Sequence, residues 1–329
     1  MSRALVMIDS VRRLGPEHEV WALCLTDEAE AGMKALDLPG VHLVTLAQLQ
    51  ASIPGLAATR QNRMPIEFYY TCMAALHRYV FDADPLIDST MYVDSDIQFF
   101  ESPARVFDEF RDSDGAITPH NFPPRLRQAE KFGIYNAGWT AFRRTPGGQK
   151  CLNWWLDRSL EWCYGYVDLE NDRFANQRYL NRFTAIAPNM KVLTHKGCNL
   201  GPWNIANYGL TERDGRVFVD DEPLYFFHFH GLKRDFHFFY FDNHRAYGAP
   251  YTRLMRTMLY RPYIAQLLKM DQVVDAVVSE APKGVVQLRG KVFLGVDVKN
   301  FLRRAKHMVI NVVDLLAGRP ILIYGDRVF

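Results

Sequence analysis

The amino-acid sequence predicts an α/β fold in which a mostly parallel sheet is flanked by helices. Two short apolar runs bounded by polar or charged residues, at 19–25 and 41–46, have the length of buried strands. Each run follows a helical pattern, at 4–14 and 27–36 respectively. A helix–strand–helix–strand order is typical of α/β sheets with parallel neighbours, and it differs from the order in sandwiches or helical bundles.

Local patterns indicate the individual elements in order. The helix of 4–14 ends at Gly15-Pro16, and the helix of 27–36 begins with an acidic first turn. A long helix is expected from Pro65, because proline favours the first helical position. Further strands and helices are expected along the following chain: strands at 91–93, 115–120 and 133–143, and helices at 103–110 and 146–165.

The chain of 329 residues is long enough for one large α/β domain and an appendage. Beyond residue 250 its character changes to helical patterns such as TRLMRTMLY and VKNFLRRAKHMVINVVDLLAG. We therefore expect a catalytic domain over 1–245 and a C-terminal helical region over 246–329.

The composition is that of an ordinary globular protein, with 48% apolar and 23% charged residues. The 39 basic and 37 acidic residues are mixed along the chain, so no basic stripe indicates nucleic acid as a partner. Five cysteines, an odd number without a C-x-x-C pair, argue against a disulfide framework or a zinc site. Neither a signal peptide nor a long apolar span is visible, so we expect a cytoplasmic protein.

A pair of carboxylates follows the apolar run Met91–Val93. Asp94 and Asp96 stand on either side of a serine, and apolar residues resume at once. Two acids at this spacing can face one open site where a strand ends, and hard cations such as Mg²⁺ or Mn²⁺ take such oxygen ligands together with substrate phosphates. Acid pairs of this kind are also common on solvated loops, so the tripeptide alone leaves both interpretations open.

A second group of polar residues lies in PLYFFHFHGLKR, at 223–234. On a strand, His228 and His230 project to the same face, and Lys233 and Arg234 follow shortly after. One imidazole could complete the shell of a cation while the basic pair meets a diphosphate. The alternative is two histidines at an aromatic sheet edge beside a solvated basic turn.

Several motifs occur together and in order: LIDSTMYVDSDIQFFESP, GIYNAGWTAFRR, CLNWW, EWCY, NLGPWN and FFHFHG. With them the chain resembles a group of bacterial GT-A glycosyltransferases related to glycosyltransferase family eight, the family of glycogenin and the lipopolysaccharide galactosyltransferases. The resemblance covers about residues 1–235 and is more specific than the acid pair alone. It implies a GT-A fold, a nucleotide-sugar donor and a divalent cation, Mn²⁺ or Mg²⁺.

The resemblance also assigns roles around the cation. It implies that Asp94 lies near the ribose and the cation, and that Asp96 ligates the cation directly. His228 matches the metal-binding histidine of the family, because Gly231 follows it in an H-x-x-G pattern; His230 is the alternative ligand.

The family's diphosphate-binding lysine lies six residues beyond its metal-binding histidine. Arg234 occupies that place here and Lys233 is one position short, so the choice between the two stays open.

Three candidate donor-sugar contacts lie in NLGPWN: Asn199, Trp203 and Asn204. Trp203 could equally belong to the core. Asn136 is a fourth candidate, since it is polar within the apolar strand YNAGW, whose glycine marks a close backbone approach. Either a passing donor sugar or a tight sheet contact explains that glycine.

The chain departs from its relatives near the reaction centre. Relatives carry Asp-Gln on the helix near the reacting sugar carbon, whereas this chain carries Asn176 and Gln177. An amide orients a hydroxyl but cannot accept its proton at neutral pH, so these two candidate catalytic residues include no base.

The prediction is therefore a metal-dependent glycosyltransferase that moves a sugar from a UDP or dTDP sugar to a cell-surface glycan or a lipid-linked acceptor. A sugar nucleotidyltransferase is one alternative, although no glycine-rich basic loop lies near the N-terminus. A catalytically inactive glycan-binding or scaffold protein is the other, because Asn176 replaces an acid.

Two expectations concern the ends of the chain. GT-A domains begin with a strand, yet only the helical pattern 4–14 precedes 19–25, so we expect the first strand to be missing. The segment 299–318 combines basic and aliphatic residues, as interfacial helices do. It predicts peripheral contact with the inner face of the membrane, and a helix packed on the catalytic domain is the alternative.

Overall fold

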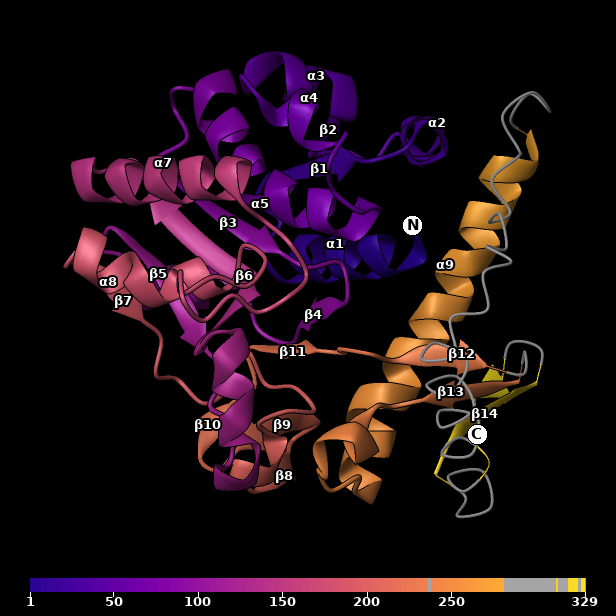
Figure 1. Ribbon diagram of the computed structural model, residues 1–329. Coiled ribbons are helices and arrows are strands. Elements are labelled where there is room, and N and C mark those ends of the chain that lie inside the picture. Colours follow the sequence, from indigo (N-terminus) through magenta and orange to yellow (C-terminus); the bar gives the residue numbers. More distant parts are fainter. Residues whose placement is uncertain (236–237, 281–311, 313–318, 325–326, 329) are drawn as a thin grey trace.

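A computed structural model describes residues 1–235, 238–280, 312, 319–324 and 327–328. Helices lie on both sides of the strands, so the expected α/β class is confirmed (Figure 1). No helix in these ranges is long and apolar enough to cross a membrane. The segment 299–318, for which membrane contact is predicted, lies outside the described residues except for Val312.

The N-terminal part alternates helices and strands as the sequence predicts. Thr26 accepts a hydrogen bond from the Ala29 amide and so begins the second helix, and Thr45 and Gln48 form a capping box at the third. The first two strands pair in parallel, with Val20 opposite Val41. The elements are α1 (Ser2–Leu14), β1 (Val20–Cys24), α2 (Asp27–Leu36), β2 (Val41–Thr45), α3 (Leu46–Ser52) and α4 (Leu56–Thr59).

The central sheet has the strand order β3-β6-β5-β7. Its strands are β3 (Ser89–Val93), β5 (Gly115–Pro119), β6 (Tyr135–Arg143) and β7 (Met190–Val192). β6 runs antiparallel to both β3 and β5, while β5 and β7 are parallel. β3, β5 and β7 therefore share one direction and only β6 is reversed, so the sheet is mostly parallel, as the sequence predicts.

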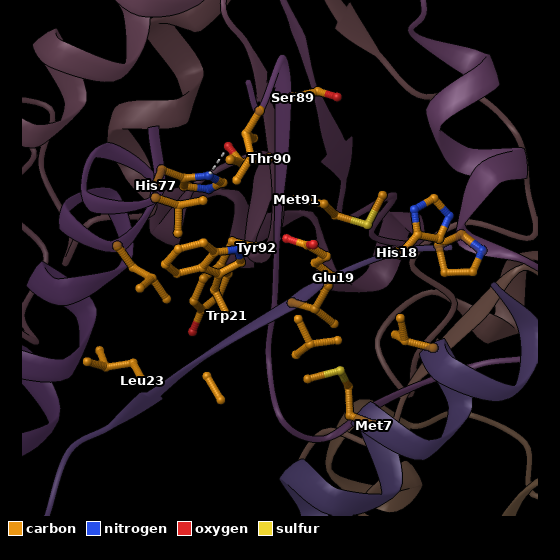
Figure 2. A pocket seen from close by; sticks show the side chains of 18 of the residues that line it. Met7, His18, Glu19, Trp21, Leu23, His77, Ser89, Thr90, Met91 and Tyr92 are labelled. Atoms are coloured by element: carbon orange, nitrogen blue, oxygen red, sulfur yellow. Dashed lines mark hydrogen bonds between the residues drawn. The ribbon is translucent and has the colours of Figure 1, made fainter. Parts of the chain in front are cut away.

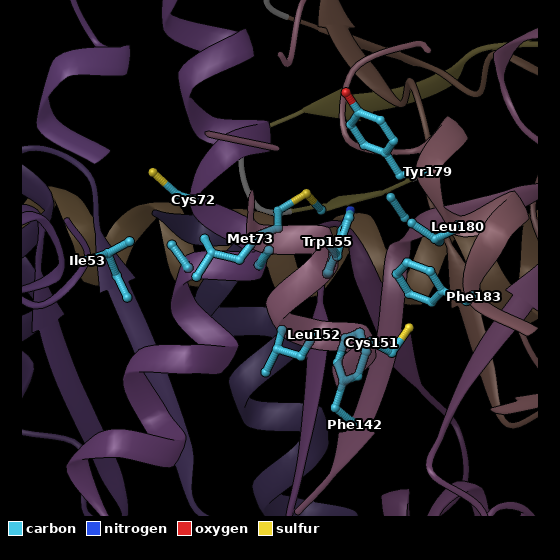
Figure 3. Close-up of a cluster of buried hydrophobic side chains, with 14 of the residues drawn as sticks. Ile53, Cys72, Met73, Phe142, Cys151, Leu152, Trp155, Tyr179, Leu180 and Phe183 are labelled. Carbon is cyan, nitrogen blue, oxygen red and sulfur yellow. The ribbon is translucent and has the colours of Figure 1, made fainter. Parts of the chain in front are cut away.

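Aromatic side chains pack between the sheet and the helices that cover it (Figure 3). Phe142 of β6 meets Trp155 with ring centroids 5.9 Å apart, and Phe183 lies 5.6 Å from the same indole. All three rings are fully buried. The covering helices are α5 (Pro65–Ala83), α7 (Pro146–Glu161) and α8 (Phe183–Ile186), with the 3-10 turn Arg178–Arg182 between α7 and α8.

β1 and β3 do not pair with each other, although α1 and α5 cover both of them. Among the described strands, β1 pairs with β2 and β3 pairs with β6, so each has one edge without a neighbour. A cavity of about 790 Å³ separates the two edges (Figure 2). We call this cavity the slot. Residues 4–8 belong to α1 and form no strand, as the sequence predicts.

A smaller antiparallel pair joins β4 (Ile97–Phe99) to β11 (Phe226–His228) below the central sheet. Phe226 and Phe227 are fully buried and anchor β11. The remaining elements of this region are α6 (Pro103–Glu109), the 3-10 segments Pro124–Phe132 and Ile205–Asn207, and the meander β8 (Leu210–Arg213), β9 (Arg216–Val219) and β10 (Glu222–Pro223).

The last described part contains helices and a small antiparallel sheet. Helix α9 (Arg261–Glu280) packs against α1, and strands β12–β15 lie beside it (Figure 1). The division at residue 245 stays a prediction. The elements here are β12 (Lys233–Asp235), β13 (Phe239–Phe241), the 3-10 turn His244–Tyr247, the π-helical turn Met255–Tyr260, β14 (Ile321–Tyr324) and β15 (Arg327–Val328).

Candidate active site

A tight turn at the end of β3 presents the two carboxylates. The Asp94 amide donates to the carbonyl oxygen of Gly138 at 2.8 Å, and the Ile97 amide donates back to the carbonyl oxygen of Asp94 at 3.0 Å. The Tyr92 hydroxyl donates to Asp94 Oδ1 at 2.9 Å. β4 then begins at Ile97, so Asp94 and Asp96 are held between two strands rather than on a solvated loop.

β11 brings His228 to the same turn. His228 lies opposite Ile97 in the β4–β11 pair, and its own amide donates to the carbonyl oxygen of Leu200 at 2.8 Å. Its Nε2 lies 2.9 Å from Asp96 Oδ1 and 3.9 Å from Asp94 Oδ2. The imidazole is buried, so its position is set by packing as well as by these contacts.

His230 lies two residues further on, beyond the end of β11. Ligand atoms of Asp96, His228 and His230 all lie within 4.8 Å of one another. Asp96 is partly accessible and His230 is exposed, so the group is open to solvent on one side. A carboxylate and two imidazoles can coordinate a divalent cation, and the open side leaves room for phosphate oxygens.

The three central groups change one another's pKa. Burial opposes ionisation of Asp96, but the charge and hydrogen bond of His228 lower the pKa of this carboxyl to about 2. Burial alone would lower the pKa of His228, yet Asp96 raises it through charge and hydrogen bonding. Burial raises the pKa of Asp94, and the charge of Asp96 adds to that rise. The site therefore stabilises positive charge beside Asp96.

Arg3 supplies a further positive charge that sequence reasoning missed. Its Nη1 lies 3.4 Å from Asp96 Oδ2, and its Nη2 donates to the carbonyl oxygen of Leu232. The guanidinium is 37% exposed, so the ion pair is weakened by solvent. No local pattern marks this arginine, because only the packing of α1 brings it to the turn after β3.

Side-chain amides form one wall of the site. Asn136 Nδ2 donates to Asn199 Oδ1 at 3.1 Å and lies 3.5 Å from His228 Nδ1. Asn199 Nδ2 donates to the carbonyl oxygen of Pro119, and Asn204 Nδ2 donates to the carbonyl oxygen of Asn199. Asn199 has a left-handed φ of 58°, which asparagine tolerates better than most residues. These amides are buried and hold the backbone around His228.

Gly138 allows the carboxylate and the imidazole to approach β6. A Cβ atom at this position would lie 2.6 Å from Asp94 Oδ2 and 2.8 Å from His228 Cε1. The register between β5 and β6 shifts beside it, as in many strands next to active sites. The glycine in YNAGW thus marks a close approach of side chains to the strand.

Trp203 stands edge-on to the two histidines. Its ring centroid lies 5.1 Å from that of His228 and 5.7 Å from that of His230. The indole is buried, and its Nε1 has no acceptor among the described residues. Trp203 is therefore both a packed residue and a wall of the site.

Asn176 and Gln177 stand apart from the carboxylates. Asn176 Nδ2 donates to the carbonyl oxygen of Tyr70 at 2.9 Å and lies 2.6 Å from Met73 Sδ. Gln177 Nε2 donates to the carbonyl oxygen of Phe132 at 2.9 Å, and its Oε1 accepts from the Ala137 amide at 3.3 Å. Gln177 is thus hydrogen-bonded to β6 one residue before Gly138, whereas the Asn176 amide is hydrogen-bonded to helix α5.

Lys233 and Arg234 are neighbours on β12 and therefore project to opposite faces. Arg234 Nη1 lies 4.0 Å from Asp271 Oδ2 of α9. His230 is exposed as a residue, but its imidazole lies against Trp203, and burial of the ring lowers its pKa. The charges of His228, Arg3 and, last, Lys233 lower the pKa of His230 further. Lys233 thus acts electrostatically on His230, whereas Arg234 lies near Asp271.

Comparison with known proteins yields distant relatives. No family model matches the chain. Two proteins of Bacillus subtilis (strain 168), both named as uncharacterized, are similar in sequence. YfnF is 26% identical over 239 residues, which cover 70% of this chain and 78% of YfnF. YfnD is 25% identical over 280 residues, which cover 83% of this chain and 88% of YfnD.

Two solved structures are similar in shape. Galactosyltransferase LgtC, in complex with donor and acceptor sugar analogs, is 16% identical with a TM-score of 0.48, over 78% of this chain and 96% of LgtC. Mouse xyloside xylosyltransferase 1, in its apo form, is 14% identical with a TM-score of 0.37, over 58% of this chain and 79% of that one. These likenesses are too distant to carry an argument, so function is argued from the site itself.

Proposed function

We propose that this chain is a glycosyltransferase that moves a sugar from a nucleoside-diphosphate sugar, with UDP or dTDP as the nucleotide. The observation that carries the proposal is the convergence of Asp94, Asp96 and His228 at the end of β3. The motifs that supply these residues stand in the order seen in GT-A glycosyltransferases of family eight. The proposed acceptor is a cell-surface glycan or a lipid-linked sugar.

In this proposal Asp96 and His228 ligate Mn²⁺ or Mg²⁺, Asp94 lies beside the cation and the ribose, and His230 is an alternative ligand. The fit rests on the donor set, since carboxylate oxygens and imidazole nitrogens all lie within reach of one ion. When bound, the cation neutralises charge that develops on the departing diphosphate.

Other residues of the chain orient the donor. Lys233 is proposed to bind the diphosphate, because Arg234 is engaged with Asp271 of α9. The amides Asn136, Asn199 and Asn204, with Trp203, are proposed to line the sugar pocket. Gln177 positions β6 beside them through the Ala137 amide.

Calorimetry of UDP binding with and without Mn²⁺ tests the cation site. Asp96→Asn and His228→Ala should each abolish the Mn²⁺-dependent part of binding, because each removes one ligand. Asp9→Asn is the matched control, since Asp9 is exposed on α1. Unchanged Mn²⁺ dependence in both site variants, with Tm values near that of the control, would refute the assignment.

The reaction itself needs a separate assay. Incubation with UDP sugars and Mn²⁺ without acceptor should release UDP slowly, whereas a catalytically inactive scaffold would release none. Incubation with a sugar phosphate and a nucleoside triphosphate should release no pyrophosphate. Pyrophosphate release would assign the chain to the sugar nucleotidyltransferases instead.

A further inference from the structure

A second cavity lies between helices α7 and α8, outside the candidate active site. Its volume is about 450 Å³, within the range of about 300–1,000 Å³ that is typical of small-molecule sites. Its walls come from the C-terminal half of α7, the loop 171–173 and the stretch 179–186, which includes α8. Helices α7 and α8 pack against each other (Figure 1). We call this cavity the α7–α8 pocket, and none of the residues that line it belongs to the candidate active site.

Helical spacing decides which face of α7 lines the pocket. Trp154, Arg158 and Glu161 follow one another at intervals of four and three residues, so they lie on one side of the helix. The neighbouring Trp155 faces the core, where it is fully buried against Phe142. Trp154 is only partly buried, so it is the indole that α7 presents to the pocket.

Trp154 gives the pocket a flat apolar wall. The indole stands edge-on to the Tyr179 ring, with the two centroids 5.8 Å apart and an interplanar angle of 88°. Tyr179 is buried, and its hydroxyl donates to the carbonyl oxygen of Trp162 at 2.9 Å, so packing holds both rings in place (Figure 3). Ile186 adds aliphatic surface. A fixed aromatic wall of this kind can cover the C–H face of a sugar ring at low entropic cost.

The charged groups of the pocket balance one another. Each guanidinium in its lining lies in an ion pair with a carboxylate: Arg158 with Glu161 at 2.5 Å, Arg173 with Asp168 at 2.8 Å and Arg182 with Asp172 at 3.1 Å. These pairs leave little excess positive charge for a phosphate or a carboxylate ligand. They do place groups that only donate hydrogen bonds beside groups that only accept them. A hydroxyl both donates and accepts, so neighbouring hydroxyls match this arrangement.

Arg158 also has a donor that lacks an acceptor. Its Nε is buried and makes no hydrogen bond to any described residue, although the side chain as a whole is 43% exposed. Buried donors are almost always paired in proteins. An acceptor for this N–H is therefore expected from outside the described residues, and a hydroxyl group in the pocket that Arg158 lines can supply it.

The turn Arg178–Arg182 connects the pocket to the candidate active site. Gln177, directly before this turn, accepts a hydrogen bond from the Ala137 amide of β6, which is one of the strands beside the cation site. Tyr179 and Arg182, within the turn, line the pocket. A ligand in the pocket is therefore held by the same short segment that contacts this strand.

We propose that the α7–α8 pocket is a second carbohydrate site, which binds a neutral sugar unit of a glycan against Trp154. The indole covers the C–H face of the sugar ring, the guanidinium groups of Arg158 and Arg182 donate to its hydroxyls, and the carboxylates beside them accept. That this glycan is the acceptor rests on the proposed function, because a glycan acceptor has sugar units beyond the one that reacts. The acceptor is then a glycan chain rather than a single lipid-linked sugar.

Calorimetry with neutral tetrasaccharides tests the proposal. Cellotetraose, maltotetraose, mannotetraose and chitotetraose are each titrated onto the chain up to millimolar concentration. At least one of them should bind, and Trp154→Ala should weaken this binding by about tenfold or more, as expected for an aromatic residue at the centre of a binding site. Tyr166→Ala is the matched control, because Tyr166 is an aromatic residue that is 59% exposed and does not line the pocket. The control should bind as the unaltered chain does.

A second variant keeps the proposal testable if Trp154→Ala lowers Tm. Ala185 is exposed and lines the pocket, so Ala185→Phe fills the pocket without removal of a buried side chain. Ala185→Phe should abolish tetrasaccharide binding at an unchanged Tm. If no tetrasaccharide binds, or if both pocket variants bind as tightly as the unaltered chain, the proposal is overturned.

Inorganic phosphate is the anionic probe of the same pocket. Tetrasaccharide binding should be equal at about 0.05 M and about 0.5 M salt, because salt screens charge and the proposed ligand is neutral. Phosphate should show no binding that Ala185→Phe removes. Phosphate binding that this variant removes and that weakens with salt, without tetrasaccharide binding, would make the pocket an anion site and overturn the proposal.

Failure of this inference can be told apart from failure of the proposed function, because UDP with Mn²⁺ is titrated onto the same unaltered chain. Tetrasaccharide binding that depends on Trp154, without UDP binding, would retain the carbohydrate site and contradict the glycosyltransferase. Mn²⁺-dependent UDP binding without tetrasaccharide binding would reject the carbohydrate site alone.

Discussion

Replacement of Gly138 by alanine is the sharpest test of how the strand β6 positions the cation site. The added Cβ would lie 2.6 Å from Asp94 Oδ2, 2.8 Å from His228 Cε1 and 3.1 Å from Asn136 Oδ1. Ordinary contact begins at 3.4 Å, so Asp94 Oδ2 must move by about 0.8 Å. The proposed ligand His228 must move by about 0.6 Å in the same way, whereas metal–ligand distances lie within about 0.2 Å of their ordinary values.

Gly138→Ala should therefore weaken Mn²⁺-dependent UDP binding by about 10- to 100-fold, the range seen when the groups that orient metal ligands are removed. Overpacking should cost about 1–3 kcal/mol of stability. Calorimetry gives the affinity, and chemical denaturation gives the free energy of unfolding.

Gly209→Ala is the matched control, because its Cβ would meet only Asp220 Oδ1 at 3.6 Å. The control should bind UDP and Mn²⁺ as the unaltered chain does. Gly138→Ala with unchanged affinity would refute the argument that the glycine makes room for Asp94 and His228. Loss of stability without loss of affinity would assign Gly138 to packing alone.

Three further outcomes follow from the site. Mn²⁺ affinity should fall as pH falls through the raised pKa of His228, since the protonated imidazole cannot bind metal, and calorimetry from pH 8.5 to 6 measures this fall. Lys233→Ala should weaken UDP binding by several-fold more than Arg234→Ala, because Arg234 lies beside Asp271; calorimetry giving the reverse order would reassign the diphosphate contact. Asn176→Asp should lower the free energy of unfolding by about 1–3 kcal/mol, because the carboxylate cannot donate to the buried carbonyl oxygen that now accepts from the amide, and it should not increase transfer activity. A stable Asn176→Asp variant with higher activity would contradict this account.

The ion pair of Asp96 and His228 also sets the direction of the acid response. The pKa of Asp96 is lowered to about 2, so its contribution to stability is fully present above the ordinary carboxyl pKa. This contribution is lost as pH falls from the ordinary carboxyl pKa through the lowered pKa of about 2. The raised pKa of His228 acts in the opposite direction, since its contribution is lost as pH rises through the folded value. The pair therefore stabilises the fold most between these two titrations.

Much of the fold could be predicted because the periodicity of apolar residues is a local property. Helices at 4–14 and 27–36 and strands at 19–25 and 41–46 were expected, and the structure places α1, α2, β1 and β2 there within a residue or two. The antiparallel course of β6 was not expected. The residues of YNAGWTAFR do not indicate whether this strand runs parallel or antiparallel to the strands beside it, because strand pairing depends on the path of distant segments.

The residue types of the candidate site were also visible in the sequence. A D-x-D tripeptide after an apolar run indicates carboxylate ligands, and an H-x-H pair before a basic turn indicates imidazole ligands beside a diphosphate contact. Their convergence was decided by tertiary structure, through the β4–β11 pairing that sets His228 beside Asp96. The contact between Arg3 and Asp96 and the size of the slot lay beyond sequence reasoning. Both depend on how helix α1 packs across β1 and β3, and packing between distant segments is not encoded in any local pattern.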